Sequence, residues 1–189
     1  SGIDMFALMA MPLFMLAGEI MNRIQVTHRM VELANALIGN IRGALAHVNI
    51  VVSILFAGLT GAAVADTAAL GTMLIPAMEK DGYPRSFAAA VTAASSIIGP
   101  IIPPSIIMVI YGSMMNVSIA GLFAAGIVPG VLVGAALMLL SAHISKKRNY
   151  PKGERRASLK EMGVAFRRVF LSLLTPVIIL GGVLTGMFT

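Results

Sequence analysis

The chain has 189 residues, of which 58% are hydrophobic and 12% charged, and its mean hydropathy of +0.91 excludes a soluble domain with an ordinary polar surface. It has no cysteine and three histidines, which excludes a disulfide framework and leaves little from which a catalytic metal site could be built. The formal charge of +6 is concentrated between residues 146 and 168, where it indicates a cytoplasmic loop rather than a nucleic-acid-binding patch. We therefore expect an all-α integral membrane protein.

The first two predicted elements differ in their polarity. Residues 1–23 are predicted to form a transmembrane helix, which is apolar through its middle apart from Glu19. Glu19 either pairs with Arg23 at the level of the lipid headgroups or contacts a partner subunit. Residues 24–42 place apolar side chains on one helical face and polar side chains on the opposite face. This pattern predicts an amphipathic helix at the membrane interface.

Residues 43–80 are predicted to form a re-entrant helical hairpin. Gly58 and Gly61, in the middle of this apolar stretch, free the backbone to turn. The turn divides the stretch into half-helices at 44–57 and 62–78, and each half is too short to cross a bilayer comfortably. The alternative is one long tilted span with a centre weakened by glycine.

A charge-free run from residue 86 to residue 144 contains the most unusual motif of the chain. Three prolines and a glycine interrupt it within the stretch Gly99 to Ser105. Proline removes a backbone donor and clashes with the preceding turn, so a regular helix cannot continue through this stretch. Residues 86–115 are therefore predicted to form a broken transmembrane helix, a device with which many transporters build a binding site. The alternative is a structural helix that proline merely kinks.

The last three predicted elements fix the topology. Residues 118–145 and 169–189 are predicted transmembrane helices, and they flank a cytoplasmic basic loop at 146–168 with nine Lys or Arg residues against two Glu. Traced backwards from this loop, the broken helix runs from inside to outside. The stretch 43–80 then begins and ends on the cytoplasmic side, which a hairpin does and a single span does not.

The ends of the half-helices predict the chemistry of the site. C-terminal ends carry partial negative charge and free carbonyl oxygens, which suit a hard cation such as Na⁺. N-terminal ends offer N–H groups, which suit the carboxylate of a substrate. We expect mostly backbone oxygens to bind Na⁺ at Gly58, Thr60, Gly61, Ser95, Ser96 and Gly99. We expect the substrate to contact Thr60, Asp66 and Ser105. Asp66 either complements its helix dipole or serves the cation or the substrate directly.

Two long stretches of the chain resemble the large membrane subunit of the tripartite ATP-independent periplasmic (TRAP) transporters. They are residues 56–78, which include FAGLTGAAVADTAALG and LIPAM, and residues 88–105, AAAVTAASSIIGPIIPPS. The shorter stretches 12–22 and 126–130 are similar to the same family. Many relatives have Ser where this chain has Thr60, which keeps the hydroxyl group.

The resemblance implies a Na⁺-driven importer of an organic acid in the bacterial inner membrane, and no enzymatic activity. It implies an ion-transporter-like fold with an elevator-like motion, of which this chain is the first of two inverted repeats. It also implies two partners, a periplasmic substrate-binding protein and a small membrane subunit. Four-carbon dicarboxylates, sialic acid and other carboxylates all remain open as substrates. The alternative function is a non-transporting membrane scaffold or channel subunit.

Overall fold

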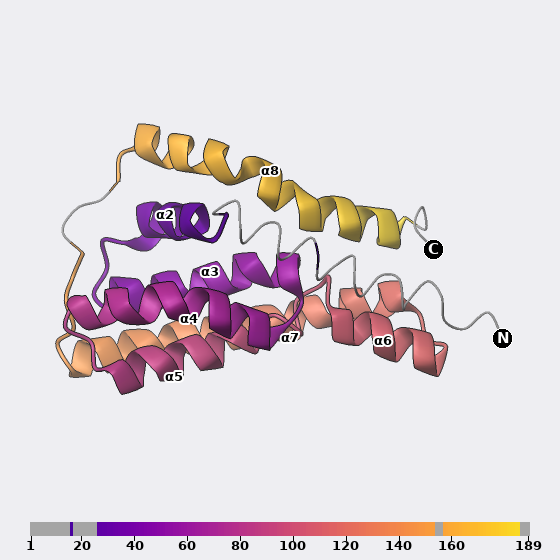
Figure 1. The fold of residues 1–189 in the computed structure, drawn as a ribbon, viewed down its shortest axis with the longest axis horizontal. Helices are drawn as coiled ribbons and strands as arrows, with labels where there is room; N and C mark the ends of the chain where they lie inside the picture. The colour runs from indigo at the N-terminus through magenta and orange to yellow at the C-terminus, as the bar shows by residue number, and fades with distance from the viewer. Residues whose placement is uncertain (1–15, 17–25, 154–156, 186–189) are drawn as a thin grey trace.

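A computed structural model describes residue 16, residues 26–153 and residues 157–185, and the predicted helix at 1–23 therefore lies almost wholly outside the described residues. The described residues form α-helices and no β-strand, in agreement with the predicted all-α class. In chain order the helices are α2 (Val26–Ile38), α3 (Ala44–Thr60), α4 (Ala63–Lys80), α5 (Arg85–Ser96), α6 (Ile106–Met115), α7 (Ile119–Lys147) and α8 (Leu159–Leu184). They form the elongated bundle that Figure 1 shows.

The helices α3 and α4 pack against each other and are joined by a tight turn, so together they form a hairpin (Figure 1). The turn is made by Gly61, whose φ of 58° is left-handed and whose N–H donates to the carbonyl of Ala57 at 3.1 Å. The helix α3 is thus three residues longer than the predicted half-helix. Gly58 lies inside it, because Gly61 alone adopts the conformation that ends the helix.

The proline-rich stretch separates α5 from α6. The helix α5 ends at Ser96, and α6 begins at Ile106, where the side chain of Ser105 accepts a hydrogen bond from Met108 N–H at 3.4 Å. Residues 97–105 between them form turns and bends rather than helix. The ten residues of α6 extend about 15 Å, half the thickness of a bilayer core. Two short helices thus replace one continuous span.

Three glycines of α7 bring this helix close to the broken stretch. A Cβ atom on Gly126 would collide with the carbonyl oxygen of Ile101, and one on Gly130 would collide with the side chain of Ile102. A Cβ atom on Gly134 would lie 2.9 Å from Ile54 of α3. The glycine face of α7 therefore supports both the loop that interrupts the broken helix and the hairpin beside it.

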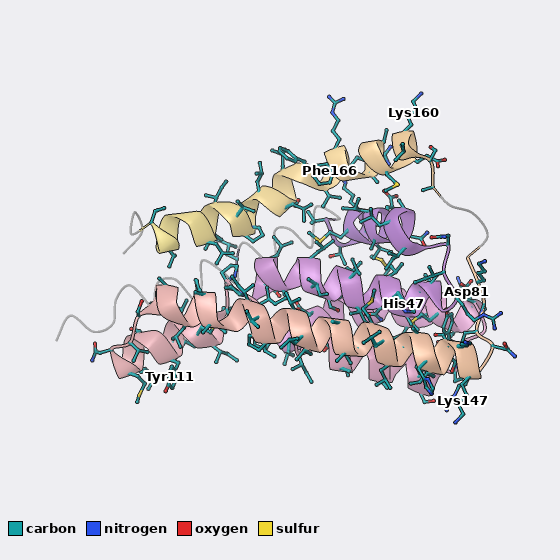
Figure 2. All side chains as sticks on the ribbon, turned by 180° about the vertical axis from the view of Figure 1, so that it is seen from behind. His47, Asp81, Tyr111, Lys147, Lys160 and Phe166 are labelled. Carbon is teal, nitrogen blue, oxygen red and sulfur yellow. The ribbon has the colours of Figure 1, made fainter. Side chains whose placement is uncertain are left out.

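Three connections gather at one end of the bundle. The ring of Tyr83, between α4 and α5, lies 4.6 Å from the ring of Tyr150 after α7. The N–H of Gly43, before α3, donates to the carbonyl of Pro151 at 2.9 Å. Burial, reinforced by the negative charge of Asp81, raises the pKa of Tyr83 to about 12 and keeps its ring neutral. Figure 2 shows Asp81 and Lys147 near this end and Tyr111 at the opposite one.

The helix α8 begins earlier than the sequence analysis predicted. A capping box between Ser158 and Glu161 starts the helix at Leu159, so helix covers much of the stretch predicted as a basic loop at 146–168. The predicted span at 169–189 is correspondingly displaced toward the N-terminus. Charged residues in the first turns of α8 do not prevent helix formation because they are exposed. Further along the helix, Arg168 lies 3.6 Å from Glu32 of α2.

The helices α7 and α8 are long and apolar enough to cross a membrane. The 29 residues of α7 extend about 43 Å, more than the hydrocarbon thickness of a bilayer. Large apolar side chains on both helices face outward, including Leu132, Leu139, Leu171 and Val177.

The helix α2 is amphipathic in the structure, with Met30 and Ala34 fully buried and Glu32 on its polar side.

Candidate functional site

The tip of the α3–α4 hairpin lies directly against the end of the proline-rich stretch. A Cβ atom on Gly61 would lie 2.7 Å from the carbonyl oxygen of Pro104 and 3.0 Å from the backbone nitrogen of Ile106. No side chain fits at this position, and only glycine also adopts its left-handed backbone without strain. The hairpin turn and the start of α6, predicted to be separate parts of one site, are therefore in backbone contact.

Asp66 joins the hairpin to the break in the second helix. Its side chain is fully buried, and its Oδ1 atom accepts a hydrogen bond from the hydroxyl of Thr60. On the other side, a Cβ atom on Gly99 would lie 2.5 Å from Asp66 Oδ2. Within the described part of the chain, Oδ2 has no hydrogen-bond partner. An acidic oxygen thus lies buried at the point where the two broken elements meet.

The end of α3 adds backbone oxygens to the same tip. The turn at Gly61 satisfies the carbonyl of Ala57. Among the described residues, the next three carbonyls, those of Gly58, Leu59 and Thr60, accept no backbone hydrogen bond. Free carbonyls at a helix C-terminus carry partial negative charge. Together with the carboxylate of Asp66, they form the kind of oxygen-rich end that suits a hard cation.

Ser95 and Ser96 use their hydroxyl groups in the packing of α5. The hydroxyl of Ser53 on α3 donates to Ser95 Oγ at 2.9 Å, and that of Ser96 donates to the carbonyl of Thr92 at 2.7 Å. Their backbone carbonyls accept N–H groups of the following turn, from Ile98 at 3.1 Å and from Gly99 at 3.0 Å. These two residues therefore support the break, and their hydroxyls are already engaged.

A polar seam between α3 and α5, formed by Asn49, Ser53, Thr92 and Ser95, was not predicted from the sequence. The amide of Asn49 donates to Thr92 Oγ1 at 2.7 Å, and its oxygen lies 3.4 Å from Ser95 Oγ as acceptor. All of these side chains are buried. The signal in the sequence was the spacing of Asn49 and Ser53, four residues apart in an otherwise apolar helix, which places both on one face.

The remaining predicted site residues lie at the edge of this junction. Ser105 is buried and caps α6, and its Cα lies 3.0 Å from the Cβ position of Gly61. The N-terminus of α6, with its free N–H groups, therefore lies at the same junction. Gly58 instead faces α8, where a Cβ atom would lie 2.8 Å from Pro176. The absence of a side chain on Gly58 thus allows α3 to pack closely against α8.

Comparisons with known proteins give a consistent result. The family "Tripartite ATP-independent periplasmic transporter, DctM component" matches residues 1–189. The chain is 49% identical, over its whole length, to a sialic acid TRAP transporter large permease protein of Vibrio cholerae, of which it covers 44%. It is 42% identical to a 2,3-diketo-L-gulonate TRAP transporter large permease protein of Escherichia coli and covers 44% of it. A C4-dicarboxylate TRAP transporter large permease protein of Pseudomonas aeruginosa is 39% identical over 97% of the chain, which covers 43% of that relative.

Proposed function

The chain belongs to the DctM component of the tripartite ATP-independent periplasmic transporters, and we propose that it is part of a large permease subunit that imports an organic acid across the bacterial inner membrane with Na⁺. Members of this family are membrane permeases rather than enzymes. The chain spans only 43–44% of the length of the three relatives described above. Transport is therefore proposed for the complete protein, of which this chain is a part.

The observation that carries this proposal is the contact between the hairpin tip and the broken helix. Asp66 Oδ2 is buried against Gly99, and the last carbonyls of α3 are free at the same tip. Buried acidic and carbonyl oxygens at an interruption of two helices are the means by which transporters bind coupling ions. We expect Na⁺ to bind here, mainly to backbone oxygens from the predicted set Gly58, Thr60, Gly61, Ser95, Ser96 and Gly99.

Asp66 is proposed to add negative charge to this cation site. Its Oδ1 atom is occupied by the hydroxyl of Thr60, which leaves Oδ2 as the available oxygen. The carboxylate of the substrate is expected nearer to Thr60 and Ser105, where the N-terminus of α6 offers N–H groups. A second, inverted repeat of the complete subunit would contribute the other half of both sites.

The names of the relatives support an acidic substrate without selecting one. The three relatives described above are named for sialic acid, 2,3-diketo-L-gulonate and C4-dicarboxylates, each of which carries a carboxylate. We propose that a periplasmic binding protein delivers such a carboxylate and that a small membrane subunit completes the transporter. The ligand of the binding protein would then set the substrate.

Reconstitution of the complete transporter tests the proposal. The large subunit is placed in proteoliposomes with its small membrane subunit, and the binding protein is supplied outside with radiolabelled sialic acid or succinate. We expect uptake with an inward Na⁺ gradient and little uptake when K⁺ replaces Na⁺. Equal uptake under both gradients would favour a channel, and no uptake of any carboxylate bound by the binding protein would favour a scaffold.

A further inference from the structure

A pocket distant from the hairpin tip opens where the turn before α3 meets the end of α7. Its volume is about 630 Å³, and it is lined by Ile41, Arg42, His47, Ala142, Lys146 and Asn149. Figure 2 shows His47 and Lys147 toward the same end of the bundle as Asp81. Nothing in the proposed transport site uses this pocket.

The lining of the pocket is cationic. Arg42 and Lys146 contribute two positive charges from separate elements, and none of the described lining residues is acidic. The guanidinium of Arg42 donates to Asn149 Oδ1, which orients the arginine across the pocket. Basic side chains with several N–H donors at one point are suited to a phosphate group, which accepts hydrogen bonds on each of its oxygens.

The walls of the pocket are fixed by the backbone behind them. Arg42 and Lys152 form an isolated antiparallel bridge, and the adjacent N–H of Gly43 donates to the carbonyl of Pro151. His47 is buried, with Nδ1 2.9 Å from the carbonyl oxygen of Gly43. The lining therefore comes from a loop that backbone hydrogen bonds hold against the end of α7.

The pocket continues into an apolar surface. Ala142 lines the pocket, and about one turn earlier on the same side of α7 the side chain of Leu139 is 73% exposed. Both belong to a helix that is long and apolar enough to span a membrane. A molecule with a phosphate headgroup and acyl chains could therefore place the headgroup against Arg42 and Lys146 and the chains along α7.

We propose that this pocket binds the phosphate group of an anionic phospholipid of the cytoplasmic leaflet. The proposal rests on membership of a membrane permease family and on the predicted cytoplasmic side of Lys146, and it is independent of Na⁺ coupling. The second charged groove of the bundle, between α2 and α8, is less suitable because Glu32 and Glu161 line it together with Lys160 and Arg168. Arg168 already lies 3.6 Å from the carboxylate of Glu32.

Lipid binding by the complete subunit tests the proposal. Phosphatidylglycerol, phosphatidylcholine or inorganic phosphate is titrated into the purified protein in detergent, and bound lipid is measured by native mass spectrometry. We expect tighter binding of phosphatidylglycerol than of phosphatidylcholine, and an affinity about fivefold weaker in Lys146→Ala. That change corresponds to about 1 kcal/mol for one basic residue near an anionic membrane surface.

Matched variants separate the pocket from general charge. Lys147→Ala removes the same charge from a residue that does not line the pocket, and should change the affinity by less than about twofold. Asn149→Ala removes the partner of Arg42 but no charge, and should lie between the two. Equal affinity of the parent and Lys146→Ala, or an equal loss in Lys147→Ala, would overturn the proposal. If inorganic phosphate displaced phosphatidylglycerol at concentrations similar to those at which the lipid binds, the pocket would instead be a site for a free anion.

Discussion

The carboxylate of Asp66 faces the backbone of Gly99 so closely that a methyl group on Gly99 would lie 2.5 Å from Asp66 Oδ2. Asp66 lies in α4 of the hairpin and Gly99 in the break between α5 and α6, and both residues are buried. This relationship connects the hairpin tip to the break between α5 and α6, and the first two predictions follow from it.

Gly99→Ala should weaken the dependence of transport on Na⁺. The new methyl group would displace Asp66 Oδ2 and approach the carbonyl of Ser96, which lies 3.2 Å from the Cβ position. Strain of this kind typically costs about 1–3 kcal/mol, so we expect the Na⁺ concentration at half-maximal uptake to rise about tenfold.

A suitable control for this variant is Gly163→Ala, because nothing lies within 4 Å of its Cβ position. Uptake is measured in proteoliposomes over a series of external Na⁺ concentrations. An unchanged Na⁺ dependence in Gly99→Ala would show that the approach of Asp66 to Gly99 has no part in cation binding.

Asp66→Asn should impair transport far more than folding. The amide keeps the shape of the side chain and can still accept the hydroxyl of Thr60, but it loses the negative charge at the free oxygen. We expect initial uptake rates to fall at least about tenfold, with the melting temperature of the purified protein changed by only a few degrees. Equal rates at matched expression would mean that Asp66 only complements the dipole of α4.

Ser96→Ala should leave the Na⁺ dependence almost unchanged, although Ser96 belongs to the predicted cation site. Its hydroxyl donates to the carbonyl of Thr92 within α5, and the substitution leaves the backbone oxygen in place. We expect the Na⁺ concentration at half-maximal uptake to change by less than about twofold. A loss as large as that of Gly99→Ala would show that the hydroxyl itself binds the cation.

Asn49→Ala should destabilise the packing of α3 against α5. The substitution removes the buried hydrogen bond from the Asn49 amide to Thr92 Oγ1, which keeps only its bond to the carbonyl of Ala88. Loss of a buried hydrogen bond costs about 0.5–1.5 kcal/mol, which should lower the melting temperature in detergent. The matched variant Thr72→Ala removes an exposed hydroxyl that bonds only its own helix, and should have little effect. Equal melting temperatures for both would contradict the role assigned to the seam.

Single cysteines at Ser158 and Asn116 should react from opposite sides of the membrane. The 189 residues contain no cysteine, so once any cysteine elsewhere in the complete subunit is replaced, each introduced thiol reports on its own position. A membrane-impermeant maleimide applied to intact cells should label Asn116→Cys, beyond α6, and spare Ser158→Cys, before α8. Labelling of both from outside would reverse the predicted topology of the basic loop.

The sequence was sufficient to predict the two interruptions because glycine and proline act locally. Three prolines between residues 100 and 104 exclude a regular helix there whatever surrounds the chain. The left-handed backbone of the hairpin turn favours glycine for an equally local reason. Which glycine ends α3 depends on distant residues. Gly58 remains helical because it packs on Pro176, while Gly61 turns against Pro104.

Other features depended on partners that a linear pattern does not identify. The place of Ser95 at a helix end predicts a backbone oxygen for the cation site, but it does not show that Ser53 and Asn49 on another helix engage the hydroxyl. The start of α8 is a different case, because the capping box of Ser158 and Glu161 is visible in the sequence. The predicted loop rested on the density of charged residues alone and did not use that signal.

The backbone contact of Gly61 with Pro104 and Ile106 restricts how this part of the protein can move. With only 2.7 Å between the Cβ position of Gly61 and the oxygen of Pro104, a gap that admitted a solute would have to open by parting two tightly fitted backbones. Displacement of the hairpin and the broken helix as one rigid unit avoids that loss of contact. If the complete protein imports a carboxylate as proposed, its entry route would therefore run along the outside of this unit, with the opposite wall supplied by another part of the transporter.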